Sequence, residues 1–285
     1  MNIDEIGIIC KEDDRGALAL AARVIDWLKK KNISCLIEDH IAAYLEHEYT
    51  EDVWSNADLL VAIGGDGTLL RAARLSSRRD VPILGAHMGS LGFLAEVTED
   101  KVEGAIEAIL NDEYIRDERT MFEATLIRDD RIIASQIVLN DAVINKGALA
   151  RIIEIEVWVD TTFITRYRAD GLILSTPTGS TAYNLAAHGP IVYPHVPAII
   201  LTPICPHVLS NRSIVLPDSQ EVEIILNAQV SSDNIYLTLD GQRGYPMEGG
   251  DKLLVKKAGH KTILMRSPQR DYFQVLRTKL KWQER

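Results

Sequence analysis

The stretch AIGGDGTLLRAAR, from Ala62 to Arg74, places three glycines around one aspartate. It follows an apolar run over residues 57–62 that is typical of a buried strand, and it precedes apolar residues at helical spacing. A glycine turn between a strand and a helix directs backbone N–H groups and the positive helix end into one concavity, which suits phosphate. Because a carboxylate repels phosphate, phosphate binding alone does not explain why Asp66 occupies this turn. We interpret it as an acid that faces a reacting hydroxyl.

The glycines of this turn, Gly64, Gly65 and Gly67, would let the backbone approach a phosphate or ribose closely. The turn lacks the lysine of a P-loop and the G-x-G-x-x-G pattern of a dinucleotide fold. A tight turn without a ligand is the alternative interpretation, since glycine clusters mark turns in many proteins. Thr68 follows the turn directly, and Arg71 lies one helical turn further on, where it would help to hold phosphates.

A second cluster, RADGLILSTPTGSTAYNLAAHGP, runs from Arg168 to Pro190. It predicts a strand over residues 172–175, then a hydroxyl-rich loop and a short helix from Ala182. Five hydroxyl residues and a glycine form a dense group of donors there, and helix capping explains only one or two of them. Tyr183 has a ring that could stack on a base, although a single tyrosine more often serves packing.

Two shorter motifs give weaker signals. VLNDAVINKG places Asn140 and Asp141 at the end of an apolar strand, but this pair is also common in turns. TLDGQ places Asp240 before a glycine at a strand end, close to Gln242. A plain hairpin turn is at least as good an interpretation of that segment.

The composition is that of an acidic globular protein. The chain has 285 residues, enough for two domains, and is 46% hydrophobic and 25% charged. Its net charge of -10 argues against a general nucleic-acid or anionic-membrane surface. We expect a cytoplasmic protein, because no signal peptide or membrane span is evident and the three cysteines show no CxxC spacing. We identify no set of metal ligands in the chain.

Hydrophobic periodicity changes near residue 119. Strands alternate with helical patterns before it, which predicts a Rossmann-like α/β domain with a mostly parallel sheet. Short alternating segments follow it and predict an all-β domain, a β-sandwich. The C-terminal tail returns to a helical pattern and is expected to return to the first domain. We predict an α/β domain over residues 1–116 plus 268–285, and a β-sandwich domain over residues 117–267.

The individual elements follow from the same patterns. In the first domain, Thr98 is the expected N-cap of a closing helix, and the strand candidates are residues 6–10, 34–38, 57–65 and 81–86. In the second domain, two strands are expected around an Asp129–Asp130 turn, and further strands at residues 151–168, 222–227, 234–240, 252–258 and 261–267.

In combination and order, these motifs resemble the bacterial NAD kinase family. The matching segments are GGDGTLL, MGSLGFL, LND, DGLILSTPTGSTAYN, PHVLSNRSIVLP and LDGQ. The resemblance covers most of the chain, from the third predicted strand onward. STPTGSTAYN is highly specific. The Gly-Gly-Asp-Gly turn is less so, because diacylglycerol kinases, sphingosine kinases and 6-phosphofructokinases share versions of it.

The resemblance implies transfer of the γ-phosphoryl of ATP to the 2′-hydroxyl of the adenosine ribose of NAD. It implies Mg²⁺ or another divalent cation as cofactor, a homodimer or homotetramer, and a catalytic role for Asp66 against that hydroxyl. The candidate ligand-binding residues, from the motifs and the resemblance together, are Gly64, Gly65, Gly67, Thr68, Arg71, Phe93, Asn140, Asp141, Arg168, Asp170, Thr178, Ser180, Thr181, Ala182, Tyr183, Ala186, Asp240 and Gln242.

Three positions depart from the family pattern. The family commonly reads S-A-G-G-P after YNL, whereas Ala186 lacks the serine hydroxyl and His188 replaces a glycine. Asp141 is one methylene shorter than the family's glutamate. We expect altered affinity and an unchanged reaction, because the catalytic positions are intact.

Two other functions stay open on sequence alone. A lipid kinase of the diacylglycerol or sphingosine class should show a basic or apolar membrane-seeking surface, which this acidic sequence does not. A non-catalytic dinucleotide sensor would have no need for an acid in the glycine turn.

Overall fold

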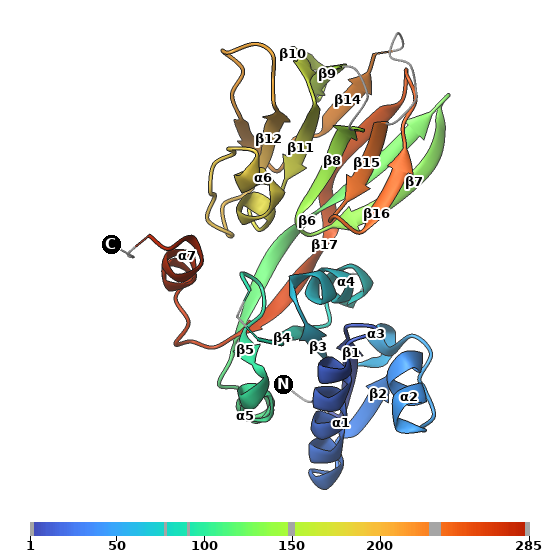
Figure 1. The fold of residues 1–285 in the computed structure, drawn as a ribbon, viewed down its shortest axis with the longest axis vertical. Helices are drawn as coiled ribbons and strands as arrows, with labels where there is room; N and C mark the ends of the chain where they lie inside the picture. The colour runs from blue at the N-terminus through green and yellow to red at the C-terminus, as the bar shows by residue number, and fades with distance from the viewer. Residues whose placement is uncertain (1–2, 77–78, 90–91, 148–151, 228–234, 283–285) are drawn as a thin grey trace. The chain divides into compact units, whose positions relative to one another are not determined.

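The structure, a computed structural model, describes residues 3–76, 79–89, 92–147, 152–227 and 235–282 (Figure 1). The chain forms two compact units. Unit 1 comprises Met1–Glu118 and Thr262–Arg285, and unit 2 comprises Arg119–Lys261. Two long strands, β6 (Ile115–Arg128) and β17 (Lys252–Arg266), carry the chain from one unit to the other. Residues 90 and 91 of the MGSLGFL motif lie outside the described residues.

Unit 1 is an α/β domain with a parallel sheet. The order of neighbouring strands is β2-β1-β3-β4, and β17 adds its last residues beside β4, with Leu264 opposite Ile83. The strands are β1 (Glu5–Cys10), β2 (Ser34–Ile37), β3 (Leu59–Gly64), β4 (Ile83–His87) and β5 (Val97–Thr98). The helices are α1 (Arg15–Lys30), α2 (Asp39–Leu45), α3 (Val53–Asn56), α4 (Asp66–Ser76), η2 (Glu99–Lys101), α5 (Val102–Leu110) and α7 (Tyr272–Leu280).

Local signals explain why unit 1 folds in this way. Helix α1 begins after Asp14, whose side chain accepts hydrogen bonds from the N–H groups of Gly16 and Ala17. Its apolar stripe, which includes Val24 and Ile25, shares one hydrophobic core with β1, β3 and α5. Helices therefore cover a sheet of buried strands, as the alternating pattern predicted.

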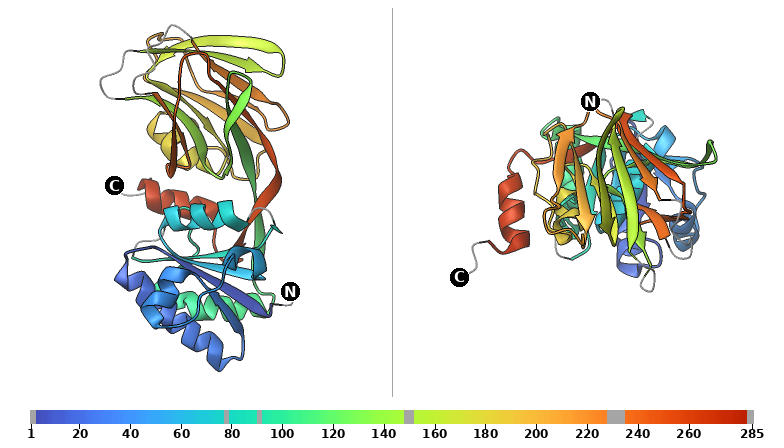
Figure 2. Two further views of the ribbon diagram at one scale, coloured as in Figure 1. Left: turned by 90° about the vertical axis from the view of Figure 1, so that its right-hand side faces the viewer. Right: turned by 90° about the horizontal axis from the view of Figure 1, so that it is seen from above.

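Unit 2 is an all-β domain in which two sheets share one hydrophobic core (Figure 2). One sheet has the order β13-β12-β11-β8-β15-β16, and β10, β9, β14 and β17 are neighbours in the other. The remaining elements are β7 (Arg131–Val138), β8 (Asp141–Lys146), β9 (Ile153–Val159), β10 (Thr162–Ala169), β11 (Gly171–Ser175), η3 (Gly179–Thr181), α6 (Tyr183–Ala186), β12 (Ala198–Ile204), β13 (Ile214–Pro217), β14 (Val222–Leu226), β15 (Ile235–Leu239) and β16 (Arg243–Pro246).

Several sequence patterns of unit 2 are confirmed. In β9 the burial alternates strictly, with Ile155 and Val157 inside and Glu154 and Glu156 on the other face. The β6–β7 hairpin turns at Asp129 and Asp130, which both adopt left-handed backbone angles, φ 48 and φ 57. Such angles at both central residues are those of a type I′ turn.

One local prediction is wrong, and another is confirmed only in part. The segments 252–258 and 261–267 were expected as separate strands, yet they form the single strand β17, because Gly259 and His260 continue the extended backbone instead of turning. Thr98 occupies the N-cap position of η2, which leads directly into α5, but its side chain makes no capping hydrogen bond. Its hydroxyl donates to the carboxylate of Asp100 at 2.5 Å, and α5 itself starts after Lys101.

Candidate active site

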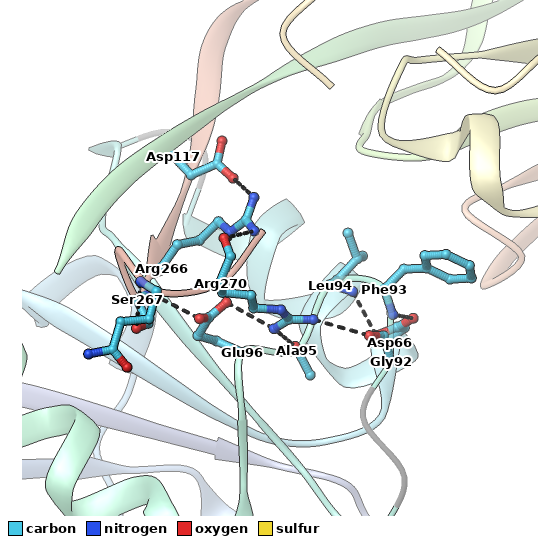
Figure 3. A network of polar contacts seen from close by, with 11 residues as sticks. Asp66, Gly92, Phe93, Leu94, Ala95, Glu96, Asp117, Arg266, Ser267 and Arg270 are labelled. Carbon is cyan, nitrogen blue, oxygen red and sulfur yellow. Dashed lines mark hydrogen bonds and ion pairs between the residues drawn. The ribbon is translucent and has the colours of Figure 1, made fainter. Parts of the chain in front are cut away.

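Asp66 is held by the backbone of a distant loop. Strand β3 ends at Gly64, and α4 begins at Asp66 itself. The Asp66 carboxylate accepts hydrogen bonds from the N–H groups of Phe93 at 3.1 Å and Leu94 at 3.3 Å (Figure 3). A carboxylate in the first turn of a helix also gains from the positive end of the helix. The side chain is only partly buried, so the acid is fixed in place and still accessible.

The glycines around Asp66 differ in what surrounds them. A Cβ on Gly64 would lie 2.3 Å from the Thr68 hydroxyl, and a Cβ on Gly92 would lie 2.1 Å from an Asp66 carboxylate oxygen. Both positions therefore require glycine. A Cβ on Gly65 would meet nothing within 4 Å, so the backbone at Gly65 is open to a ligand, and Gly67 is exposed.

Arg71, the candidate phosphate contact, lies among acids. Its guanidinium pairs with the Glu38 carboxylate and lies 3.7 Å from that of Glu12. Glu38 is buried, and this burial raises the pKa of its carboxyl while the charge of Arg71 opposes the rise. A phosphate that binds Arg71 would have to compete with Glu38 for the same guanidinium.

Unit 2 contains a cavity of about 370 Å³, within the size range of small-ligand sites. It lies beside the start of β8 and the β15–β16 turn. Five of the candidate residues meet there. The lining consists of Asn140, Asp141, Val143, Asn145, Ala182, Tyr183, Thr238, Asp240 and Gly241.

Asp240 organises one wall of this cavity. It occupies the turn of the β15–β16 hairpin in a left-handed conformation, with φ 49. Its carboxylate accepts hydrogen bonds from the N–H groups of Leu139 at 3.0 Å, Asn140 at 2.7 Å and Asp141 at 3.1 Å. Asp240 thus forms the hairpin turn and also fixes the backbone of the Asn140–Asp141 pair.

Asp141 has an unusual ionisation. Burial first, and then the negative charge of Asp240, raise the pKa of its carboxyl from 3.8 to about 7. Near neutral pH the group is therefore partly protonated. In the protonated form Asp141 can donate a hydrogen bond to a ligand, and in the ionised form it can only accept one.

Most hydroxyls of the hydroxyl-rich loop form hydrogen bonds with other groups of the protein. Ser180 is fully buried and donates to the carbonyl of Pro177 at 2.6 Å. The Thr178 hydroxyl accepts from the Arg119 guanidinium at 3.2 Å, and the Thr181 hydroxyl donates to the Thr178 carbonyl at 3.4 Å. A Cβ on Gly179 would lie 2.1 Å from the Asn140 carbonyl oxygen, so the loop packs tightly on that backbone. The loop thereby places Ala182 and Tyr183 at the cavity.

The remaining candidates of unit 2 are not among the residues that line the cavity. Asp170 pairs with Lys146 at 3.4 Å, and Arg168 on β10 pairs with Glu154 at 3.3 Å. Ala186 on α6 is exposed, as is Gln242 in the β15–β16 turn.

Some site residues were missed from the sequence. Val143 and Asn145 follow Asp141 at every second position of β8, so strand alternation places all three on one face and was a usable signal. Arg270 binds the loop that holds Asp66 and pairs with Glu96 at the end of that loop, and no local sequence pattern indicates either residue.

Two other properties of the described residues bear on function. No group of three or more His, Cys, Asp or Glu side chains in these ranges is arranged to hold a metal ion. Among the same residues, no helix is long and apolar enough to cross a membrane.

Comparison with known proteins gives full-length matches. Residues 6–114 match the family model of the ATP-NAD kinase N-terminal domain, and residues 139–267 match that of the ATP-NAD kinase C-terminal domain. The chain is 50% identical to the NAD kinase of Geobacter metallireducens over 283 residues, 99% of each chain. It is 47% identical to that of Geobacter sulfurreducens over 284 residues, again 99% of each.

Two solved structures have a similar fold. Yeast NADH kinase, complexed with NADH, aligns with a TM-score of 0.91 at 26% identity, over 100% of this chain and 89% of the other. An NAD kinase from Archaeoglobus fulgidus, in complex with ATP, aligns with a TM-score of 0.75 at 23% identity, over 97% of this chain and 98% of that one.

An α/β domain with an acid in a glycine turn, joined to a β-sheet domain, together with these matches, defines a phosphotransferase with an alcohol acceptor. The family models span both domains, and the relatives match over nearly the full chain. The chain belongs to the ATP-NAD kinase family. The prediction of an NAD kinase is confirmed over the lipid kinase and the dinucleotide sensor.

Proposed function

We propose that Asp66 aligns the 2′-hydroxyl of the adenosine ribose of NAD and accepts its proton as that oxygen attacks the γ-phosphorus of ATP. The observation that carries this assignment is the carboxylate at the start of α4, fixed by the Phe93 and Leu94 N–H groups and still partly exposed. A base must be held in position and must also reach its substrate. Asp66 meets both requirements.

The reaction balances with this single acid–base group. A bond forms between the ribose O2′ and the γ-phosphorus, and the bond from that phosphorus to the β–γ bridging oxygen breaks. NADP and ADP are the products, and the hydroxyl proton passes to the Asp66 carboxylate and then to solvent. Phosphoryl transfer depends mainly on positioning and charge neutralisation, so a single well-placed carboxylate is enough for the proton transfer.

The residues of the glycine turn also fit a divalent cation such as Mg²⁺. Mg²⁺ in proteins is commonly held by one or two carboxylates plus substrate phosphates. Asp66 supplies one hard carboxylate, and the triphosphate would supply the other oxygens. When bound, the cation would neutralise charge on the triphosphate and so reduce its repulsion by Asp66.

The cavity of unit 2 is our proposed site for part of the dinucleotide. The Tyr183 side chain is 40% exposed, which leaves ring surface for stacking. Asn140 offers an amide, and Asp141 offers a carboxyl that can donate or accept near neutral pH. We extend the ligand-binding proposal, from the sequence motifs and the family resemblance together, to Thr68, Arg71, Phe93, Arg168, Asp170, Thr178, Ser180, Thr181, Ala186 and Gln242.

We further propose that the chain works in the cytoplasm as a homodimer or homotetramer. The resemblance to the bacterial family supports the assembly, and the acidic sequence with few cysteines supports the compartment. Light scattering on the purified chain tests the assembly. A single species with the mass of a monomer would contradict it.

An activity assay tests the proposed reaction. The purified chain is incubated with NAD, ATP and MgCl₂, and ADP and NADP are quantified separately. We expect equal amounts of both, with NADP identified by an NADP-specific dehydrogenase, and loss of both on addition of EDTA. ADP without NADP, or NADP formation that survives EDTA, would contradict the acceptor or the cation respectively.

A further inference from the structure

One short loop of unit 1, Gly92–Glu96, links Asp66 to a buried ion pair. The pair joins Glu96 of this loop to Arg270, near the C-terminal end of the chain. The loop residues Phe93 and Leu94 donate their N–H groups to Asp66. The guanidinium of Arg270 donates to the Ala95 carbonyl and, at 3.4 Å, to the Gly92 carbonyl, so it binds the same loop from its other side (Figure 3).

The ion pair that anchors Arg270 is deeply buried. Arg270 pairs with the Glu96 carboxylate at 2.9 Å, and their side chains are only 10% and 3% exposed. The Glu96 carboxylate also accepts a hydrogen bond from the Ser267 N–H at 2.9 Å. The Arg266 guanidinium lies 3.8 Å from the Glu96 carboxylate and pairs with that of Asp117 at 3.2 Å. Buried charges are costly to desolvate and contribute little net stability, but their geometry is well defined. This cluster is therefore suited to fixing positions.

Close packing connects the cluster to Asp66. The Cα of Gly92 lies so near Asp66 that a Cβ there would fall 2.1 Å from the carboxylate, while the Gly92 carbonyl faces Arg270. Burial lowers the pKa of the Arg270 guanidinium, whereas the charges of Glu96 and, more weakly, Asp66 raise it. Asp66 and Arg270 are thus within electrostatic reach of each other, and both are bonded to the backbone of the same loop.

We propose that Arg270 is a positioning residue for phosphoryl transfer: with Glu96, it fixes the Gly92–Glu96 loop whose N–H groups orient Asp66. Arg270 itself touches neither NAD nor ATP in this account. The inference rests on the proposed role of Asp66. It explains why a residue about 175 positions away in sequence from the loop is joined to it by several hydrogen bonds.

The first test compares two substitutions of Arg270 with a control from the same tail. Arg270→Gln removes the charge, and Arg270→Lys keeps it but cannot reach the carboxylate and both carbonyls together. We expect kcat to fall about 10–100-fold for Arg270→Gln, since small misplacements of a catalytic group have effects of this size, with KM for NAD and ATP nearly unchanged. Arg270→Lys should recover part of this loss.

Arg277→Gln is the matched control. Arg277 lies on α7 in an exposed ion pair with Asp271 at 3.6 Å, and the hydrogen bonds and ion pairs of the described residues include none between Arg277 and the Gly92–Glu96 loop. The kcat of Arg277→Gln should equal that of the wild type.

If Arg270→Gln does not fold, the double variant Arg270→Gln/Glu96→Gln is measured in its place, because it removes both buried charges. A lower melting temperature with unchanged kcat of folded protein would show a purely structural role and overturn the inference.

A double-mutant cycle with Asp66→Asn separates this inference from the proposed function. NADP is measured by an enzymatic cycling assay over hours, so that strongly impaired variants stay measurable. If Arg270 acts through Asp66, Arg270→Gln lowers kcat in the wild-type background and by less than about twofold when Asp66→Asn is present. Equal losses in both backgrounds would overturn the positioning role and leave Asp66 catalytic. Wild-type turnover by Asp66→Asn alone would instead overturn the proposed function.

Discussion

Units 1 and 2 each contain an aspartate that is followed by a glycine. In both cases the aspartate carboxylate is bound by backbone N–H groups of a segment distant in sequence. Asp66 accepts two N–H groups, at 3.1 and 3.3 Å, and Asp240 accepts three, between 2.7 and 3.1 Å. Asp66 begins a helix and stays partly exposed. Asp240 forms a hairpin turn and is only 6% exposed.

The difference shows that an Asp-Gly pair has no fixed role. A carboxylate can accept about four hydrogen bonds, so Asp240, with three backbone donors and little exposure, has almost no capacity left for a ligand. Asp66 keeps both capacity and access. We therefore assign catalysis to Asp66 and architecture to Asp240, although the two motifs look alike in sequence.

Apart from replacement of Asp66 itself, the largest effect within this comparison is expected for Gly92→Ala. The new methyl group would fall 2.1 Å from the Asp66 carboxylate, so the acid or the loop must shift. We expect kcat to fall about 100-fold, because phosphoryl transfer tolerates little misplacement of the base. Steady-state kinetics on folded protein measure this.

Gly104→Ala serves as the control for this methyl addition. Gly104 lies in α5, where a Cβ meets nothing within 4 Å. That variant should keep wild-type kcat and gain about 0.5–1 kcal/mol of stability. Wild-type kcat in Gly92→Ala would show that the geometry around Asp66 is not critical.

Asp240→Asn should instead lower stability. The three N–H groups would lose a charged acceptor, and hydrogen bonds to charged groups contribute about 1.5–3 kcal/mol each. We expect the free energy of unfolding to fall by about 3 kcal/mol and kcat of the folded enzyme by less than about tenfold. Urea denaturation and kinetics on the same sample check both values. A loss of kcat at unchanged stability would reverse the roles assigned to the two aspartates.

The charge of Asp240 also predicts a pH dependence through Asp141. The pKa of Asp141 is raised from 3.8 to about 7 in the folded state, so the folded protein binds this proton more tightly than the unfolded chain does. Its contribution to stability is fully present below about pH 4 and is lost as the pH rises through about 7.

Asp141→Asn removes this titration. We expect the variant to lose less stability than the wild type between pH 4 and pH 8 and, at pH 8, to be more stable by about 2 kcal/mol. Urea denaturation at a series of pH values measures the difference. Parallel stability curves for the two proteins would show that the Asp141 pKa is not raised.

The smallest expected effect concerns His188, after α6. It adopts a left-handed conformation, with φ 63, which is unfavourable for a side chain other than glycine. His188→Gly should raise stability by up to about 1 kcal/mol, and Ala186→Gly, within α6, should lower it by about 0.5–1 kcal/mol. Chemical denaturation compares the two. A loss of stability in both would mean that the histidine side chain makes a compensating contact.

Much of the fold could be predicted from local patterns. Alternating burial in β9 and the apolar stripe of α1 depend on residues close in sequence, so periodicity reveals them. The continuity of strand β17 could not be predicted, because pairing with β14 at its start and with β4 near its end keeps it extended through Gly259. Such pairing partners are distant in the chain, and no local rule includes them.

The site shows the same limit. The glycine turn and the Asn140–Asp141 pair stood out because their residue types suggest ligand chemistry. Whether a carboxylate or hydroxyl is free depends on long-range contacts, such as those of Asp240 with Asn140 or of Thr178 with Arg119. Residue types therefore indicate candidates, and only the structure distinguishes residues that face a ligand from those that hold a loop.

The central claim is that Asp66 carries the chemistry, and the most direct test is the turnover of Asp66→Asn. This substitution keeps size and shape but removes the proton acceptor and the charge. We predict that kcat falls by roughly 10²–10⁴, the usual contribution of a positioned acid–base group, in protein whose melting curve shows it folded. Calorimetric titration should find NADP affinity preserved or increased, because an amide does not repel the 2′-phosphate. Near-wild-type turnover by folded Asp66→Asn would contradict the account.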